Sequence, residues 1–274
     1  MLWNIHNAAA SQISMLGRIT GLAFAPVAAC ATFGVTLKLA IDAIRRGEAK
    51  AVVKGASDPP PLPMVVGGFY GARVIAADGQ VSKPLTTLRG THVAGGAAIW
   101  ILGDHEHMTG LGFRPLGLEP VAVGVSSDAE HIITPSKEGP TAAIRQALDL
   151  AGAAPEQIAT WDLHATATPG DFQEVENLRE VVPGHVMVSA RKGTFGHGMG
   201  ASGGWELTAQ YLGFARGALH PTPIAAAELH PEIARMHDRF VFDAGCRVEP
   251  GWACSPTTPC TGAFRARSRA TTAT

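Results

Sequence analysis

Aromatic residues are scarce in this chain, and neither sign of charge is in clear excess. Phe, Trp and Tyr make up 6% of 274 residues, so Ala, Val, Leu and Ile have to fill most of the interior. The formal net charge is −1, which excludes the broad basic surface of a nucleic-acid-binding protein and the acidic run of a solvated tail. Hydrophobic residues make up 46%, which is too many for a disordered chain and enough for one large core or two small ones.

Cysteine is scarce as well, with four residues at positions 30, 246, 254 and 260. They form no C-x-x-C pair, and no histidine lies near Cys254 or Cys260 at zinc-site spacing. We therefore expect no metal site, and a reduced protein in the cytoplasm. The order G-x-x-x-x-G-K-[S/T] is also absent, which argues against a P-loop nucleotide site.

Charged residues are missing from residues 19–37, and this stretch allows a second interpretation of the N-terminus. Residues 27–30 (Val-Ala-Ala-Cys) resemble the lipobox of a bacterial lipoprotein, in which the cysteine is lipidated after signal cleavage. The first 17 residues hold no Lys or Arg, so the basic start of a signal peptide is missing. Two glycines and a proline interrupt the stretch, which favours a buried segment over a membrane span. A secreted lipoprotein is the alternative, and it gives no reason for the motifs described below.

Apolar periodicity predicts alternating helices and strands, and therefore an α/β class. A largely buried helix is expected to begin near Cys30 and to end at Gly47. The continuous apolar run at 97–102 predicts a buried strand, and prolines at 59–63 predict a stiff loop. Further helices are expected at 7–15, 141–151, 171–181 and 200–216, and further strands at 51–53, 118–126, 158–163, 186–190 and 241–242.

The stretch 244–274 differs in composition from the rest. It holds three of the four cysteines and several prolines, and it ends in alternating arginine and small residues. Because it shows neither a helical nor a strand period, we predict a divergent, disordered tail.

Two segments place a reactive side chain at the end of a strand-like run. Cys30 lies at the start of the expected helix, where unpaired N–H groups can stabilise a nucleophilic thiolate; a buried, inert cysteine is the alternative. His164 ends the strand 158–163 and enters a loop of small residues, where Thr166 and Thr168 can form local hydrogen bonds. An ordinary surface histidine is the alternative there.

His197 lies in a glycine-rich segment, with six glycines between positions 193 and 204. Glycine at this density indicates backbone packed closely against another part of the protein. Lys192 and Glu206 flank the histidine, and they can polarise it or pair with each other. Two solvated surface charges beside an incidental histidine are the alternative.

Together these segments resemble the β-ketoacyl-acyl-carrier-protein synthases, which are condensing enzymes of the thiolase superfamily. Residues 29–32 (Ala-Cys-Ala-Thr) are similar to the nucleophile motif of that family. Residues 164–174 are similar to its HGTxTxxGDxxE stretch, and residues 192–201 to its KxxxGHxxGA stretch, with Glu206 at the matching offset. Weaker similarities occur at 7–12, 82–90 and 126–129.

The resemblance implies a 3-oxoacyl-acyl-carrier-protein synthase, an acyltransferase of fatty-acid or polyketide biosynthesis without redox cofactor or catalytic metal. Cys30 would take an acyl group from an acyl-carrier protein as a thioester. His164 and His197 would hydrogen-bond a malonyl thioester and favour its decarboxylation to an enolate, which attacks the Cys30 acyl group. Supporting roles fall to Lys192 and Glu206, and substrate-binding roles to Thr166, Thr168 and Phe195.

The resemblance also implies an α/β fold of the thiolase-like layered type (α/β/α/β/α) over residues 1–243. A partial N-terminal half would extend to about residue 105, and the C-terminal half would begin at about residue 115. The expected partners are an acyl-carrier protein bearing acyl and malonyl groups and a second subunit, in a homodimer or a ketosynthase-like heterodimer. Neither nucleic acid nor a membrane is expected as a partner.

Four departures from the family pattern accompany the resemblance. Cys30 lies near the start of the chain, so the first strands of the N-terminal half are expected to be missing. No GFGG-type loop, whose backbone helps form the oxyanion hole, follows Asp243. Residues 94–97 (Ala-Gly-Gly-Ala) lack the glutamate of the GEGA stretch, and Ala165 replaces a glycine. A catalytically inactive ketosynthase fragment or partner subunit is therefore the alternative function.

Overall fold

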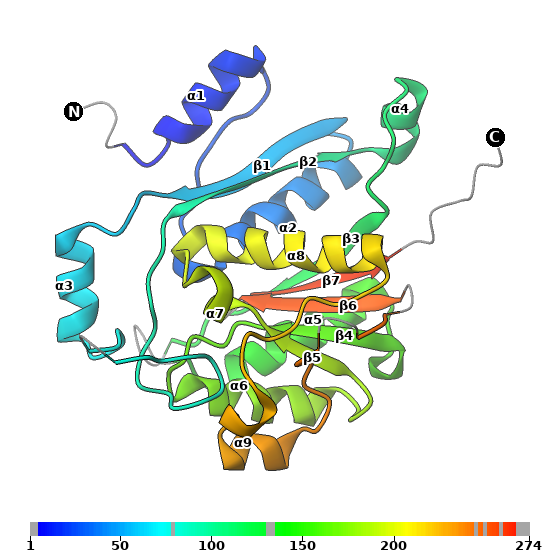
Figure 1. The fold of residues 1–274 in the computed structure, drawn as a ribbon. Coiled ribbons are helices and arrows are strands. Elements are labelled where there is room, and N and C mark those ends of the chain that lie inside the picture. The colour runs from blue at the N-terminus through cyan, green and yellow to red at the C-terminus, as the bar shows by residue number, and fades with distance from the viewer. Residues whose placement is uncertain are drawn as a thin grey trace.

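Two helices separate two β-sheets in the computed structural model, which describes residues 5–77, 80–129, 135–243, 246–248, 251–257 and 260–266. The helices are α2 (Thr32–Arg45) and α8 (Ser202–Arg216). On one side of them lies an antiparallel pair of strands, β1 (Ala51–Asp58) and β2 (Gly96–Gly103), and on the other side lies a five-stranded sheet (Figure 1). The layers are thus those of an α/β fold with a central helical layer.

The five-stranded sheet is mixed, with strand order β3-β7-β6-β4-β5. Strand β4 is parallel to β5 and β6, whereas β7 is antiparallel to β6 and β3. Helices α5 and α6 pack together beside this sheet, with α9 against α6 (Figure 1). The bounds are β3 Leu118–Val125, β4 Ile158–Leu163, β5 Met187–Ala190, β6 Trp252–Thr257, β7 Cys260–Ala266, α5 Glu138–Ala151, α6 Gly170–Val181 and α9 Pro231–Met236.

Helix α2 illustrates why the expected elements form where they do. Its buried side chains recur at the spacing of one helical face, and they pack against β2, β3, β7 and α8. Gly47, with a φ of 73°, follows the helix and allows the chain to turn. The buried residues of this face are Phe33, Leu37, Ala40 and Ile41.

Smaller elements complete the fold. Helix α1 (Ala8–Gly17) has no buried residue, and helix α3 (Pro63–Gly71) begins on a proline at its first turn. The remaining elements are α4 (His105–Gly110), α7 (Lys192–Phe195) and the 3₁₀ turns η2 (Ala29–Ala31), η3 (Pro155–Gln157), η4 (Met199–Ala201) and η5 (Ala226–Glu228). No helix in the described part of the chain has both the length and the apolar character that a membrane crossing requires.

The predicted disorder of 244–274 is wrong for the strands β6 and β7. These strands lie inside the five-stranded sheet, where β7 pairs with β3 on one side and β6 pairs with β4 on the other. Ala253, Cys254, Ala263 and Phe264 are all buried. A strand that is covered on both faces loses the alternation of apolar and polar residues, which is the signal that the sequence lacked. Residues 267–274 lie outside the described residues.

Three further expectations need correction. Strand β2 is exposed on one face, where Ile99 and Ile101 are 48% and 66% exposed, although its continuous apolar run predicted burial. Helix α3 includes Pro63, which was expected in a loop, because a proline at the first helical position costs no hydrogen bond. The strand expected at 241–242 is replaced by an isolated bridge between Phe240 and Val188. The expected helices at 7–15, 141–151 and 171–181 are confirmed to within a few residues.

Ala263→Asp tests the position of β7. The Ala263 side chain is fully buried in the core beneath the five-stranded sheet, so an aspartate there has neither water nor a partner charge. We expect a loss of about 3–5 kcal/mol in the free energy of unfolding, measured by urea denaturation. Ala227→Asp, at an exposed position, is the matched control and should cost less than about 0.5 kcal/mol. Equal stability of the two variants would contradict the placement of β7.

Gly204→Ala tests the contact between the helical layer and β2. A Cβ atom at Gly204 would lie 2.3 Å from Cβ of Ala98 and 2.5 Å from Cε2 of Phe33, both buried. We expect the overpacking to cost about 1–3 kcal/mol in thermal or urea unfolding. Gly67→Ala in α3 has no atom within 4 Å, and its higher helix propensity should add up to about 1 kcal/mol. A Gly204→Ala protein as stable as the unmodified chain would contradict the contact.

Candidate active site

Cys30 lies in a sharp turn immediately before α2. The preceding residue, Ala29, is held in the left-handed region with a φ of 47°, which is unfavourable for any residue with a Cβ. Thr32 fixes this turn, because its hydroxyl accepts a hydrogen bond from the Ala28 N–H (2.9 Å) and donates one to the Ala29 carbonyl (2.7 Å). The Ala-Cys-Ala-Thr sequence thus builds a turn that leaves Cys30 partly accessible.

His164 begins the loop between β4 and α6, and two acidic side chains hold that loop. The Glu174 carboxylate accepts hydrogen bonds from the backbone N–H groups of His164 (2.6 Å) and Ala165 (2.7 Å). The Asp171 carboxylate accepts hydrogen bonds from the N–H groups of Thr166 (2.9 Å) and Leu85 (2.8 Å). The G-D-x-x-E part of the motif therefore satisfies backbone donors that burial would otherwise leave unpaired.

His197 is positioned by backbone contacts of the glycine-rich segment. Its N–H donates to the carbonyl of His92 (2.6 Å), and its carbonyl accepts from the N–H of Ala94 (2.9 Å). A Cβ atom on the next residue, Gly198, would lie 2.1 Å from the ring of Trp205, so only glycine fits there. Gly196, with a φ of 77°, also favours glycine.

The three predicted catalytic side chains converge. The Cys30 sulfur and one ring nitrogen of each of His164 and His197 all lie within 4.8 Å of one another. The two imidazole rings meet edge to face, with centroids 5.4 Å apart and planes at 79°. Nδ1 of His164 and Nε2 of His197 are buried and have no hydrogen-bond partner. Three segments that are distant in sequence therefore place a thiol and two imidazoles together.

Burial sets the protonation of this cluster. It lowers the pKa of His197 to about 3 and the pKa of His164 well below its usual value, and the Lys192 ammonium adds to both shifts. Burial also raises the pKa of the Cys30 thiol to about 11, although Lys192 opposes this shift. These shifts favour neutral imidazoles and a protonated thiol in the resting site, and a thiolate stabilised by the helix N-terminus stays a prediction.

Lys192 and Glu206 form a buried ion pair next to the cluster. Burial raises the pKa of Glu206 to about 7, while Lys192 draws it down. The sequence allowed these two charges either to polarise the histidine or to pair; they do pair, and the interpretation of both as solvated surface charges is wrong. Each would be costly to bury alone, so the pair places a nearly neutral group beside the imidazoles.

A second buried ion pair, between Arg191 and Asp162, supports the segment from the other side. The Arg191 Nε donates to the Asp162 carboxylate (2.5 Å), and Ser189 also donates to that carboxylate (3.1 Å). Arg191 further donates to the carbonyl of His220 (3.1 Å). Because Arg191 precedes Lys192 directly, this pair fixes the backbone from which Lys192 reaches Glu206.

The remaining predicted site residues, Thr166, Thr168 and Phe195, are not part of the Cys30–His164–His197 cluster. The hydroxyls of Thr166 and Thr168 hydrogen-bond each other (2.9 Å), as expected for a loop held by local hydrogen bonds. Phe195 is half-buried and packs edge to face on Trp205, with ring centroids 5.3 Å apart. Their contact with a substrate stays a prediction.

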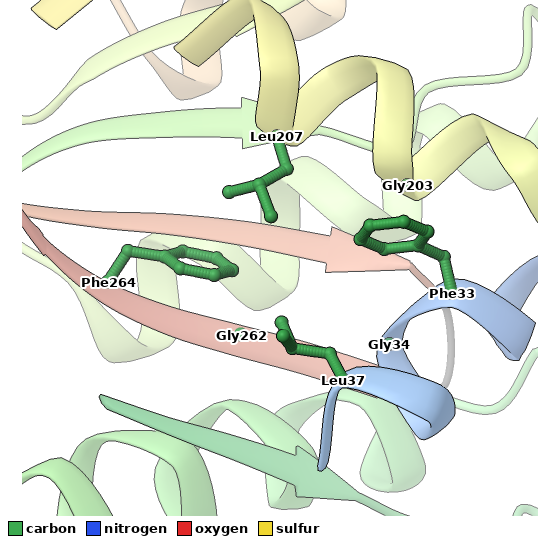
Figure 2. A pocket seen from close by; sticks show the side chains of 7 residues that line it. All are labelled: Phe33, Gly34, Leu37, Gly203, Leu207, Gly262 and Phe264. Carbon is green, nitrogen blue, oxygen red and sulfur yellow. The ribbon is translucent and has the colours of Figure 1, made fainter. Parts of the chain in front are cut away.

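An apolar recess lies on the α2 side of the cluster. Figure 2 shows the side chains of Phe33, Leu37, Leu207 and Phe264 converging between α2, α8 and β7. Three glycines complete the lining, and no polar side chain contributes to it. Phe33 is three residues from Cys30, so the recess begins one helical turn from the thiol.

Sequence reasoning assigned no role to Asp162, Asp171 or Glu174, although each holds part of the site. Asp171 and Glu174 stand in the quoted motif, where two acids beside a loop of small residues were the available signal. Asp162 is a charged residue within the apolar strand β4, and a charge in a buried strand predicts a partner. Met199 was also overlooked: its sulfur lies 3.1 Å from Nδ1 of His197.

Comparisons with known proteins show the family of this chain. The family models for the N-terminal and C-terminal domains of beta-ketoacyl synthase match residues 1–107 and 119–225. Nodulation protein E of Rhizobium sp. (strain N33) is 32% identical over 241 residues, which are 84% of this chain and 59% of that protein. The 3-oxoacyl-[acyl-carrier-protein] synthase 2 of Staphylococcus aureus is 31% identical over 238 residues, which are 83% of this chain and 59% of that protein.

The fold is also found among solved structures. A complex of a type II PKS acyl-carrier protein with its ketosynthase matches 96% of this chain and 67% of that chain, with a TM-score of 0.82 and 21% sequence identity. The chain belongs to the beta-ketoacyl synthase family, and its fold is the thiolase-like fold of ketosynthases. It spans 59% of the length of the two curated relatives described above.

Asp162→Asn tests the buried Arg191–Asp162 ion pair, which holds the backbone next to Lys192. Asparagine keeps the shape but leaves the Arg191 guanidinium, 3% exposed, without a counter-charge. We expect a loss of about 3–5 kcal/mol in urea unfolding, because a buried charge that loses its partner is not compensated by water. The matched control is Asp42→Asn, which breaks the partly exposed Lys38–Asp42 pair and should cost less than about 1 kcal/mol. A similar effect of both substitutions would contradict the role of the buried pair.

Proposed function

We propose that this chain carries the site of a 3-oxoacyl-acyl-carrier-protein synthase, which condenses a cysteine-bound acyl group with a malonyl thioester. The observation that supports the proposal is the convergence of the Cys30 sulfur with a ring nitrogen of His164 and of His197. A thiol next to an unprotonated imidazole is the arrangement that nucleophilic acyl transfer needs.

The first step would load the acyl group on Cys30. The thiol proton moves to a neutral imidazole as the sulfur attacks the acyl thioester of the carrier protein. The carrier thiol leaves, takes up a proton, and Cys30 keeps the acyl group as a thioester. The high pKa of the buried thiol makes this proton transfer necessary, since little thiolate is present beforehand.

The second step would form the new carbon–carbon bond. A malonyl thioester loses CO₂, and the electron pair of the broken bond forms an enolate whose oxygen accepts hydrogen bonds from His164 and from the tautomer of His197 that carries its proton on Nε2. The enolate carbon attacks the Cys30 thioester, the carbon–sulfur bond breaks, and the cysteine sulfur takes up a proton. The product is a 3-oxoacyl thioester on the carrier protein.

The supporting residues fit this reaction. The unpartnered nitrogens of the cluster have no protein group to bind, and a substrate oxygen would supply the missing partner. Lys192 and Glu206 would keep both imidazoles neutral and in place, Thr166 and Thr168 would shape the loop beside the thioester, and Phe195 would border the acyl group.

The proposal extends to organisation and partners. We place an N-terminal half up to about residue 105 and a C-terminal half from about residue 115, on either side of the helical layer. An acyl-carrier protein and a second ketosynthase-type subunit, in a homodimer or heterodimer, are the proposed partners, and the cytoplasm is the proposed location.

Membership of the family is compatible with fatty-acid or polyketide biosynthesis. A non-catalytic partner subunit is the second candidate, favoured by the missing GFGG-type loop and disfavoured by the retained Cys30.

Acylation of Cys30 is the direct test. The purified chain is incubated with acyl-carrier protein that bears a medium-length acyl group, and its intact mass is measured. We expect an acyl adduct on the unmodified chain and on Cys246→Ala, whose cysteine lies outside the cluster, and none on Cys30→Ala. An adduct that persists in Cys30→Ala, or no adduct on a folded unmodified chain, would refute the nucleophile.

A further inference from the structure

The catalytic cluster also has the composition of a binding site for a soft metal ion. A cysteine sulfur and two histidine nitrogens are the ligands that Zn²⁺ prefers, whereas Mg²⁺ and Ca²⁺ require oxygen ligands. The three ligand atoms lie within 4.8 Å of one another, and they come from the turn before α2, the loop after β4 and the glycine-rich segment. Ligands at about 2.0–2.3 Å from a tetrahedral zinc ion lie about 3.3–3.7 Å apart, so binding would draw the three atoms closer together by up to about 1.5 Å.

The tautomer of His197 favours this use. Its Nδ1 lies 3.1 Å from the sulfur of Met199, and a thioether can only accept a hydrogen bond. In the tautomer that carries the proton on Nδ1, this N–H can donate to the sulfur, and Nε2 keeps its lone pair. Nε2 is buried without a partner, and the residue is only 5% exposed. A buried lone pair beside a thiol is a vacant ligand position, and the N–H contact to sulfur fixes the ring as an outer partner does in metal sites.

We propose that Cys30, His164 and His197 bind a thiophilic divalent cation of the zinc class, with water as a fourth ligand, and that the bound cation blocks acylation of Cys30. The blocking effect rests on the proposed function, whereas the binding does not. On binding, the thiol proton passes to solvent and the sulfur coordinates as a thiolate. The cation is thus an inhibitor that competes for the nucleophile, and it takes no part in the condensation.

The charges around the cluster allow a cation there. Metals bind the neutral form of imidazole, and the described residues place no carboxylate in hydrogen-bond contact with Nδ1 of His164 or Nε2 of His197. The charge of Lys192 is balanced by the buried Glu206 carboxylate. The carboxylate of Glu174 accepts hydrogen bonds from the backbone N–H groups of His164 and Ala165. A cation that displaces the thiol proton therefore brings in only one additional positive charge.

Cobalt absorption is the direct test, because Co²⁺ bound to a thiolate gives a charge-transfer band in the near ultraviolet. The full chain, freed of metal by a chelator and carrying no histidine tag, is titrated with Co²⁺ and then with Zn²⁺. Cys30→Ser and His197→Asn remove ligands, and Cys246→Ser and His107→Asn are the matched controls outside the cluster. Near-ultraviolet circular dichroism checks that each variant is folded.

We expect the band in the unmodified chain and in both controls, and its loss on addition of Zn²⁺. Cys30→Ser should abolish it, and His197→Asn should weaken Co²⁺ binding by at least about 10–100-fold, the loss that even outer-shell partners cause. A folded unmodified chain without the band, or a band that persists in Cys30→Ser, would overturn the proposal.

Alkylation gives a second readout that needs no variant. Zn²⁺ should slow the reaction of Cys30 with iodoacetamide by at least about tenfold and leave Cys246 unaffected, as measured by peptide mass. Equal rates at Cys30 with and without Zn²⁺ would contradict the site. Acylation by the charged carrier protein, measured with a chelator and with Zn²⁺, separates the two hypotheses. A chain that binds Co²⁺ but is not acylated in chelator has the metal site without the proposed function. A chain that is acylated equally with chelator and with Zn²⁺ has the proposed function, but the bound cation does not inhibit it.

Discussion

The close approach of the glycine-rich segment to helix α2 is the constraint on which the site depends. At Gly200 a Cβ atom would lie 3.2 Å from Cβ of Thr32, and at Gly204 it would lie 2.5 Å from the Phe33 ring. Side chains at these positions would push α8 away from α2, because a close-packed interior has no space to absorb them. Cys30 lies two residues before α2 and His197 five residues before α8, so the same contact helps to keep the imidazole and the thiol together. It also sets the spacing of the two sheets.

Desolvation is the second determinant, since it fixes the chemical state of the converging groups. The same burial that lowers the pKa values of His164 and His197 raises that of Cys30. A protonated thiol beside two neutral imidazoles can transfer a proton internally, and it can also exchange that proton for a soft cation. The proposed condensation and the proposed inhibition therefore arise from one electrostatic environment. The Lys192–Glu206 pair keeps that environment nearly neutral.

The helices and the candidate catalytic residues could be predicted from the sequence, because the patterns that indicate them lie within short segments. Helices α2 and α5 carry apolar residues at helical spacing and end at glycines with positive φ, so their positions followed from periodicity. The resemblance indicated Cys30, His164 and His197 because their motifs are short and contiguous. The strands β6 and β7 were not predicted from the sequence, because strands that are buried on both faces show no alternation of apolar and polar residues. Their partners β3 and β4 are also distant in sequence. The pairs Asp162–Arg191 and Asp171–Leu85 likewise depend on tertiary contact.

The sequence by itself determined the reactive side chains, the turn that presents the thiol and the glycines that permit close packing. These features depend on residue type and on neighbours within a few positions. Only the tertiary structure decided that Nδ1 of His197 lies beside the Met199 sulfur, that Lys192 meets Glu206, and that residues 252–257 and 260–266 complete the five-stranded sheet. Protonation, tautomer and strand pairing are set by groups brought close through folding, because electrostatic and hydrogen-bond energies depend on distance and burial rather than on order along the chain.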